Sequence, residues 1–282
     1  MSGSSVLFAE RKWTSTELER LRLLLSTYQD GSGQVTKATK GKSIPDGWDF
    51  EDCVAALIGT DEEVPRYAKD VFDLVVPLNS PKGGARFGIS CKMKAELVKA
   101  GKSIKASKTD GRAYLELSNA ARAFSTAFGD GEITTENFME GDNPTRTGEA
   151  LIETVNDWHS LSVKDGIDLS RSCYLVLLYS PALKFKLFQF PITLPSAKSL
   201  TWYAGKGRGG GTGKHIKGTA EDGIVFEFYG GSGGQLKYYP KVSDAIYVSD
   251  EFELEPITSD VSGLLVRKAE DYFPEKWKEV NS

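Results

Sequence analysis

Cysteine and histidine are both scarce in this sequence of 282 residues, which contains three cysteines and two histidines. The cysteines are Cys53, Cys91 and Cys173, and no two of them have the C-x-x-C spacing that is typical of a zinc site. Their odd number and wide separation also argue against a disulfide framework and favour a reducing compartment. Two histidines are too few for a histidine-rich metal cage. We therefore expect a cytoplasmic protein.

Long apolar segments are missing as well. No run reaches the roughly 18 apolar residues of a membrane helix, and the N-terminus lacks the basic and apolar regions of a signal peptide. We therefore expect no membrane partner. Hydrophobic residues make up 40% of the chain and charged residues 26%, which are ordinary values for a globular protein and exclude wholesale disorder. Because no clear linker divides the sequence, we predict one domain over residues 1–282.

A global excess of positive charge is also absent, since the formal net charge is −4. Basic residues nevertheless gather in two stretches. Residues 82–112 contain nine Lys or Arg against two acidic residues, and residues 198–217 contain five against none. A local excess of this kind is typical of a face offered to a polyanion, although a solvated lysine-rich surface has the same pattern.

The hydrophobic pattern predicts a mixed α/β fold. Helical periodicity and caps indicate helices over residues 12–29, 49–58, 113–128 and 146–161, with Asp49 as the N-cap of the second. Strands are expected over residues 71–78 and 86–94. The C-terminal half, about residues 172–260, is rich in short β-type runs. It also contains a basic glycine-rich loop over residues 204–218, which we do not expect to be a packed element.

Polar residues stand out on the two neighbouring strands near residue 80. In 86–94 the apolar residues alternate with Ser90 and Lys92, which lie side by side on the polar face about 7 Å apart. The other strand is strongly apolar yet holds Asp73 in its interior, where a carboxylate is costly unless it is hydrated, paired or metal-bound. Upstream, Glu51 lies beside the apolar stripe of its helix, so its carboxylate can reach the edge of the core.

This order of a helical glutamate, a strand aspartate, a turn and Ser-x-Lys resembles the PD-(D/E)xK nuclease superfamily, particularly its type II restriction endonucleases. The resemblance covers about residues 49–120 and implies a catalytic core over about residues 49–128. In that family the metal-binding Asp begins one strand and (E/D/S)-x-K lies on the adjacent strand. Here Phe72 replaces the proline before the aspartate, and Ser90 replaces the carboxylate of the motif. Some restriction-type members share this Ser-x-Lys and take the missing carboxylate from a helix further along.

The resemblance implies roles for five residues. Asp73 would bind Mg²⁺ together with either Glu116, on the helix predicted over 113–128, or Glu51. Mg²⁺ prefers a few carboxylate oxygens supplemented by water and substrate phosphate. Lys92 would orient or activate the attacking water and offset the charge that develops in the transition state. Ser90 would hydrogen-bond a metal-bound water. The implied fold is a restriction-endonuclease-like core, in which helices flank a mixed β-sheet.

The implied activity is Mg²⁺-dependent hydrolysis of phosphodiester bonds in double-stranded DNA at a specific sequence. We expect the basic stretches to hold the DNA through Lys94, Lys206, Arg208, Lys214 and Lys217. A palindromic site would be matched by a homodimer. A restriction enzyme also implies a cognate DNA methyltransferase as its genetic partner.

Two other interpretations remain open. The serine at position 90 is compatible with a non-catalytic DNA-binding or defence protein that has a degenerate nuclease fold. Alternatively, the strand-rich C-terminal half is suited to a modification-dependent or repair nuclease that reads an altered base. The glycine-rich GGGTGKH segment is not a P-loop, because Arg208 stands where that motif needs its first glycine and His215 where it needs Ser or Thr.

Overall fold

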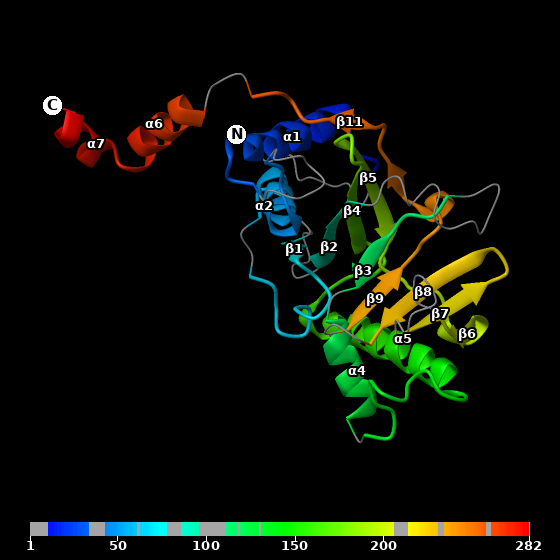
Figure 1. The fold of residues 1–282 in the computed structure, drawn as a ribbon. Helices are drawn as coiled ribbons and strands as arrows, with labels where there is room; N and C mark the ends of the chain where they lie inside the picture. The colour runs from blue at the N-terminus through cyan, green and yellow to red at the C-terminus, as the bar shows by residue number, and fades with distance from the viewer. Residues whose placement is uncertain are drawn as a thin grey trace.

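The computed structural model describes residues 11–33, 43–60, 63–77, 86–95, 111–117, 119–129, 131–205, 214–230, 234–257 and 261–281. Two β-sheets occupy the centre of this part of the chain (Figure 1). Helices α1 and α2 lie along the first sheet, α4 and α5 lie beneath the second, and α6 and α7 extend away from the body. The mixed α/β class and the strand-rich C-terminal half that the sequence predicts are therefore confirmed.

The first sheet has six strands in the order β1-β2-β4-β5-β10, with β11 also paired to β5. Strands β1 and β2 are antiparallel, whereas β2 and β4 are parallel, and helix α5 lies between them in the chain. The sheet is therefore mixed. Its strands are β1 (Leu74–Pro77), β2 (Arg86–Lys94), β4 (Cys173–Tyr179), β5 (Lys184–Pro191), β10 (Tyr247–Val248) and β11 (Phe252–Glu253).

The second sheet has five strands in the order β3-β9-β8-β7-β6, and every pair is antiparallel. Four of the five strands come from the C-terminal half, and β3 joins them at one edge. The strands are β3 (Leu115–Leu117), β6 (Thr201–Ala204), β7 (His215–Ala220), β8 (Gly223–Tyr229) and β9 (Gln235–Tyr238).

The helices begin at recognisable caps where the sequence supplies them. Thr14 and Glu17 form a capping box at α1, and Asp46 and Asp49 form one at α2. Asp46 is thus the N-cap of α2 and Asp49 is the third helical residue, so the predicted cap at Asp49 is wrong by one turn. The helices are α1 (Ser15–Ser26), α2 (Gly47–Ile58), α4 (Ala120–Phe128), α5 (Asn143–Ser162), α6 (Val261–Tyr272) and α7 (Pro274–Asn281). No helix in the described ranges is long and apolar enough to cross a membrane.

Two hydrophobic cores lie on opposite faces of the first sheet. One face of β2 and β4 packs against α1 and α2, and we call this cluster the N-terminal core; it contains Phe50, Phe87, Cys91 and Leu175 among others. The opposite face contributes to a larger cluster that also includes residues of α5 and the second sheet. We call it the shared core, and its members include Leu151, Tyr174, Val176, Phe226 and Phe228.

Three predicted elements differ from the structure. The strand predicted over 71–78 is shorter, because residues 65–72 turn on their own backbone hydrogen bonds and β1 begins only after Asp73. The helix predicted over 113–128 is wrong in its first part: Leu115 and Leu117 alternate around Glu116 in a strand, and the helix starts after Asn119. The predicted loop 204–218 contains the end of β6 and the start of β7, because pairing with neighbouring strands outweighs its glycine content.

Candidate functional site

Asp73 lies at the point where β1 begins. Its backbone N–H donates to the carbonyl of Ile89 at 3.0 Å. Ile89 is the last residue of β2 that is paired with β1. Strand β2 continues for five residues beyond Ile89, from Ser90 to Lys94, without a partner from β1. The Asp73 side chain therefore lies along an open edge of β2, where backbone N–H groups need acceptors.

Three donors of β2 converge on one oxygen of this carboxylate. Asp73 Oδ2 accepts hydrogen bonds from the Cys91 N–H at 2.7 Å, from Lys92 Nζ at 2.8 Å and from Ser90 Oγ at 3.3 Å. The predicted aspartate, serine and lysine are thus brought together, and the Cys91 backbone joins them. A backbone N–H of a strand edge fixes the carboxylate more rigidly than side chains alone, so the site is preorganised.

Lys92 is buried although it carries a charge. Its ammonium group donates to Asp73 and also to the carbonyl of Cys91 at 2.9 Å. A buried ammonium needs a counter-charge and hydrogen-bond acceptors, and both are present here. The geometry holds the Lys92 Nζ at a fixed place beside a carboxylate, which is the placement that orienting a water or a phosphate oxygen requires.

Glu51 lies on α2 and faces the same charges. The pKa of Glu51 is raised to about 7, mainly by burial and then by the negative charge of Asp73, whereas the positive charge of Lys92 acts to lower it. Glu51 makes no hydrogen bond or ion pair with any residue that the structure describes. A half-buried carboxylate without a donor, next to a second carboxylate, is unfavourable unless a proton or a cation shares the site.

Asp73 and Glu51 are the two carboxylates at this site that could hold a small divalent cation. Asp73 uses Oδ2 for all three of its side-chain hydrogen bonds, which leaves Oδ1 without a donor among the described residues. Across the described ranges, no three Asp, Glu, His or Cys groups gather closely enough to hold a metal by themselves. Mg²⁺ commonly takes only one or two carboxylates and completes its shell with water and substrate phosphate. Asp73 and Glu51 match that requirement.

Glu116, the other carboxylate predicted to bind metal, lies in a different environment. It projects from β3, accepts a hydrogen bond from Lys94 Nζ at 2.8 Å, and accepts another from the hydroxyl of Tyr114. Burial alone would raise the pKa of Glu116, but these hydrogen bonds outweigh burial and the net pKa lies below the usual range. Glu116 is therefore ionised and paired, and Glu51 is the carboxylate whose charge is coupled to Asp73.

The basic residues predicted to contact DNA are placed as follows. Lys94 pairs with Glu116, and Lys217 Nζ lies 3.1 Å from a carboxylate oxygen of Glu227. Lys214 is exposed and donates to the carbonyl of Thr135 at 3.3 Å. Lys206 and Arg208 lie outside the described residues. Contact of these five residues with DNA stays a prediction.

Sequence reasoning missed the partners of Glu227. This glutamate is buried on β8 and accepts hydrogen bonds from the hydroxyl groups of Tyr239, at 2.6 Å, and Tyr229, at 3.2 Å. Its signal was present, because Glu227 is a single acid between Phe226 and Phe228, as Asp73 is a single acid in an apolar run. Glu227 forms part of a polar surface on the second sheet, between Lys217 and Lys237.

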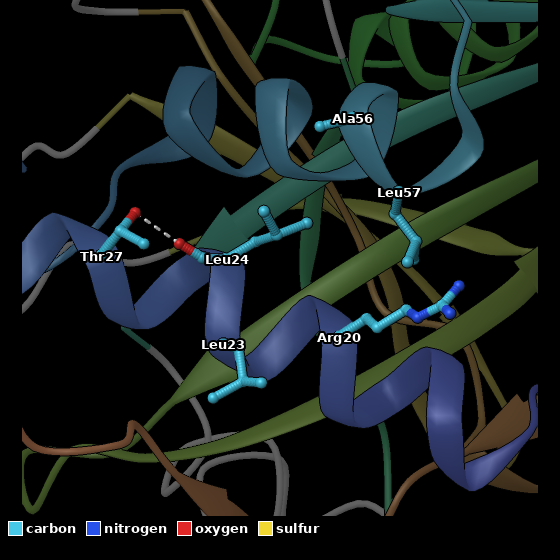
Figure 2. Close-up of a pocket in the computed structure, with 6 residues that line it drawn as sticks. All are labelled: Arg20, Leu23, Leu24, Thr27, Ala56 and Leu57. Atoms are coloured by element: carbon cyan, nitrogen blue, oxygen red, sulfur yellow. Dashed lines mark hydrogen bonds between the residues drawn. The ribbon is translucent and has the colours of Figure 1, made fainter. Parts of the chain in front are cut away.

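An apolar hollow of about 400 Å³ lies apart from these carboxylates. Figure 2 shows it between α1 and α2, and the residues drawn are Arg20, Leu23, Leu24, Thr27, Ala56 and Leu57. None of them is a candidate site residue. The polar chemistry described above is therefore separate from this hollow.

Comparison with known protein families, with curated proteins and with solved structures found no match to this chain. Any assignment of function consequently depends on the chemistry of the site.

Proposed function

We propose that this protein is a Mg²⁺-dependent endonuclease that hydrolyses phosphodiester bonds in double-stranded DNA. The observation that carries the proposal is the Asp73–Lys92 ion pair at the open edge of β2, together with the Glu51 carboxylate, which is coupled to both charges and has no hydrogen-bond partner among the described residues. Hydrolysis of a phosphodiester needs a group that neutralises its oxygens and a group that prepares a water. Two carboxylates and a fixed lysine supply the protein part of both.

Each residue has a distinct task in this proposal. Asp73 and Glu51 would hold the cation, and a bound Mg²⁺ would polarise the phosphate and lower the pKa of a coordinated water. Lys92 orients the attacking water and stabilises the negative charge that develops on the phosphate oxygens. The Cys91 N–H keeps the Asp73 carboxylate in place, and the Ser90 hydroxyl donates to the same carboxylate oxygen. Ser90 would also hydrogen-bond a metal-bound water.

We further propose that the enzyme is a sequence-specific type II restriction endonuclease of the PD-(D/E)xK kind. The supporting observation is that the aspartate precedes one strand and the Ser-x-Lys segment lies on its antiparallel neighbour. Such an enzyme would act as a homodimer on a palindromic site, because a two-fold axis of the protein then matches that of the DNA. It would also have a cognate DNA methyltransferase that protects the host DNA.

A non-catalytic DNA-binding protein is the second candidate. The observation that favours it is that a serine occupies the place of the second motif carboxylate, which leaves Asp73 and Glu51 as the two carboxylates of the described site. A repair or modification-dependent nuclease is the third, and it would share the hydrolytic chemistry but differ in substrate.

The test is an incubation of the purified protein with unmethylated phage DNA, once with Mg²⁺ and once with EDTA, followed by gel electrophoresis. Discrete fragments with Mg²⁺ alone support the restriction enzyme, and sequencing of their ends gives the site. A smear with Mg²⁺ supports a nuclease but contradicts sequence specificity. Intact DNA in both samples, and also with methylated and with mismatched DNA, contradicts the nuclease and favours the binding protein.

A further inference from the structure

Five side chains on the second sheet stand in one cross-strand row. Glu116 on β3 is opposite Lys237 on β9, which is opposite Glu227 on β8, which is opposite Lys217 on β7, which is opposite Tyr203 on β6. We call these five residues the polar row. Neighbouring strands lie about 4.8 Å apart, so the row is about 19 Å long.

The polar row meets the candidate catalytic strand at one end. Lys94 of β2 donates to Glu116 at 2.8 Å, which connects the first sheet to the second. Lys94 follows Lys92 by two residues and lies on the same face of β2, about 7 Å further along the strand. The row therefore runs from the neighbourhood of Asp73 and Lys92 across the whole width of the second sheet.

The negative charges of the row are held inward and its positive charges outward. Glu227 is enclosed by hydroxyl groups of two tyrosines and by Lys217, and its side chain is 9% exposed whereas that of Lys217 is 23% exposed. In the same way, the side chain of Glu116 is 24% exposed and that of its partner Lys94 is 34% exposed. An approaching ligand meets ammonium groups first, although the row contains two glutamates and two lysines.

Aromatic rings support this surface. Lys237 Nζ lies 4.4 Å from the ring centre of Tyr229 and 5.5 Å from that of Tyr114, so a cation–π contact on each side fixes the ammonium group. His215 stacks on Tyr229, and Tyr114 stacks on Tyr239. At the far end, Tyr203 is 44% exposed on the edge strand β6.

If the row only stabilised the sheet through cross-strand pairs, that role would explain its ion pairs. It would not account for the exposed tyrosine next to the most distant lysine, nor for the contact of Glu116, at the near end of the row, with Lys94 of the strand that carries Ser90 and Lys92. Fixed cations at regular spacing with an exposed tyrosine at the end are the groups that contact phosphates and sugars of nucleic acid.

We propose that the polar row is the surface on which the DNA duplex lies as it leaves the candidate catalytic site. Lys94, Lys237 and Lys217 contact phosphates at intervals along the duplex, and Tyr203 contacts the backbone at the far end. A length of about 19 Å corresponds to about five or six base pairs, because one strand carries a phosphate about every 3.4 Å along the duplex axis. This inference rests on the proposed nuclease function and assigns the path of its substrate.

The experiment places a charge at Tyr203, because this side chain is exposed and is not one of the paired groups of the row. Binding of a duplex that contains the cleavage site is measured with Ca²⁺ in place of Mg²⁺, at several salt concentrations, for the wild type and for Tyr203→Glu. The added negative charge should cancel about one cation–phosphate contact, and so reduce the salt slope by about one unit and the affinity about tenfold in moderate salt. The matched control is Tyr272→Glu, which alters an exposed tyrosine on α6 and should leave both values unchanged.

A second variant, on β9, shows whether the effect of Tyr203→Glu comes only from a local disturbance of β6. Lys237→Met keeps the length of the stem between the two tyrosines and removes only the charge, so a comparable loss of salt slope is expected. Circular dichroism and thermal unfolding verify that each variant is folded. Unchanged binding in both variants, when the wild type cleaves DNA with Mg²⁺, overturns the path along the row and leaves the nuclease standing. A wild type that neither cleaves nor binds DNA overturns both.

Discussion

The Glu51 carboxyl makes the free energy of unfolding depend on pH near neutrality. Its pKa of about 7 in the folded protein lies above its ordinary value of 4.5, because burial and the charge of Asp73 both disfavour the ionised form. Between these two pH values the folded state binds more protons than the unfolded state. Stability therefore falls as the pH rises through this window, and the loss is complete above about pH 7.

The first prediction follows from this loss of stability with rising pH. Glu51→Gln should unfold at a higher urea concentration than the wild type at about pH 8, and the difference should vanish below about pH 4.5, where Glu51 is protonated in both states. Urea titrations at the two pH values measure it. Asp52→Asn is the matched control, because Asp52 is its exposed neighbour on α2. Equal stabilisation by both variants would mean that general charge on α2, rather than the site, is responsible.

The second prediction concerns the cation and separates binding from catalysis. At about pH 8, millimolar Mg²⁺ should raise the thermal midpoint of the wild type, because a ligand that binds only the folded state stabilises it. The rise should be lost in Glu51→Gln, which keeps one carboxylate in place of two. Asp52→Asn should respond to Mg²⁺ as the wild type does. A full response in Glu51→Gln would exclude Glu51 as a ligand.

The third prediction concerns Lys92. In Lys92→Ala, cleavage should fall by about a hundredfold or more, because the charge that stabilises the transition state is removed, while specific DNA binding is largely retained. Cleavage assays and gel-shift titrations measure the two effects. Lys184→Ala, which alters an exposed lysine on β5, is the control and should cleave normally. Wild-type cleavage by Lys92→Ala would show that the active site lies elsewhere.

At the scale of elements, the segment just before β1 approaches β2 closely, and this approach positions the site. A side chain at Gly88 would place its Cβ 2.3 Å from the ring of Phe72, which directly precedes Asp73. Only glycine allows this approach. The position of the Asp73 carboxylate therefore depends on a residue that is neither charged nor part of the motif.

The fourth prediction follows from this contact. Gly88→Ala should destabilise the protein by about 1–3 kcal/mol, the usual cost of forcing a methyl group into a packed core. It should also reduce cleavage, because Phe72 must move and Asp73 moves with it. Gly47→Ala is the control, since a Cβ at that residue of α2 meets open space. Urea titration and cleavage assays compare the two variants. Equal stability in both would show that Phe72 adapts without cost.

The elements that sequence predicts well are those with a strong local pattern. Strand β2 is predicted with its observed limits, because apolar and polar residues alternate along its whole length, and this alternation also places Ser90 and Lys92 on one face. The position of Glu116 could not be predicted in the same way. Its three-residue strand exists because it pairs with β9, more than a hundred residues later, and the sequence near Glu116 also suits a helix.

The whole molecule is connected by the shared core. This cluster contains Tyr174 and Val176 from the first sheet together with Phe226 and Phe228 from the second. Unfolding of one sheet would therefore expose buried side chains of the other. The N-terminal core packs on the other face of the first sheet and contains all three cysteines, Cys53, Cys91 and Cys173, which are free and buried. Strands β1, β4 and β5 each contribute side chains to both cores and so connect them.

The last prediction uses the cysteines to test whether the chain is one domain. Phe226→Ala removes a fully buried ring from the shared core and should lower the free energy of unfolding by about 3–5 kcal/mol. If both cores unfold together, the urea midpoint for thiol labelling, which reports the N-terminal core, should shift as far as the midpoint from circular dichroism. A thiol midpoint that stays at its wild-type value while the dichroism midpoint falls would divide the chain into two independent units. In that case the two ion pairs near the candidate site would break at different urea concentrations. The Lys94–Glu116 pair, which joins the two sheets, would break before the Lys92–Asp73 pair within the first sheet.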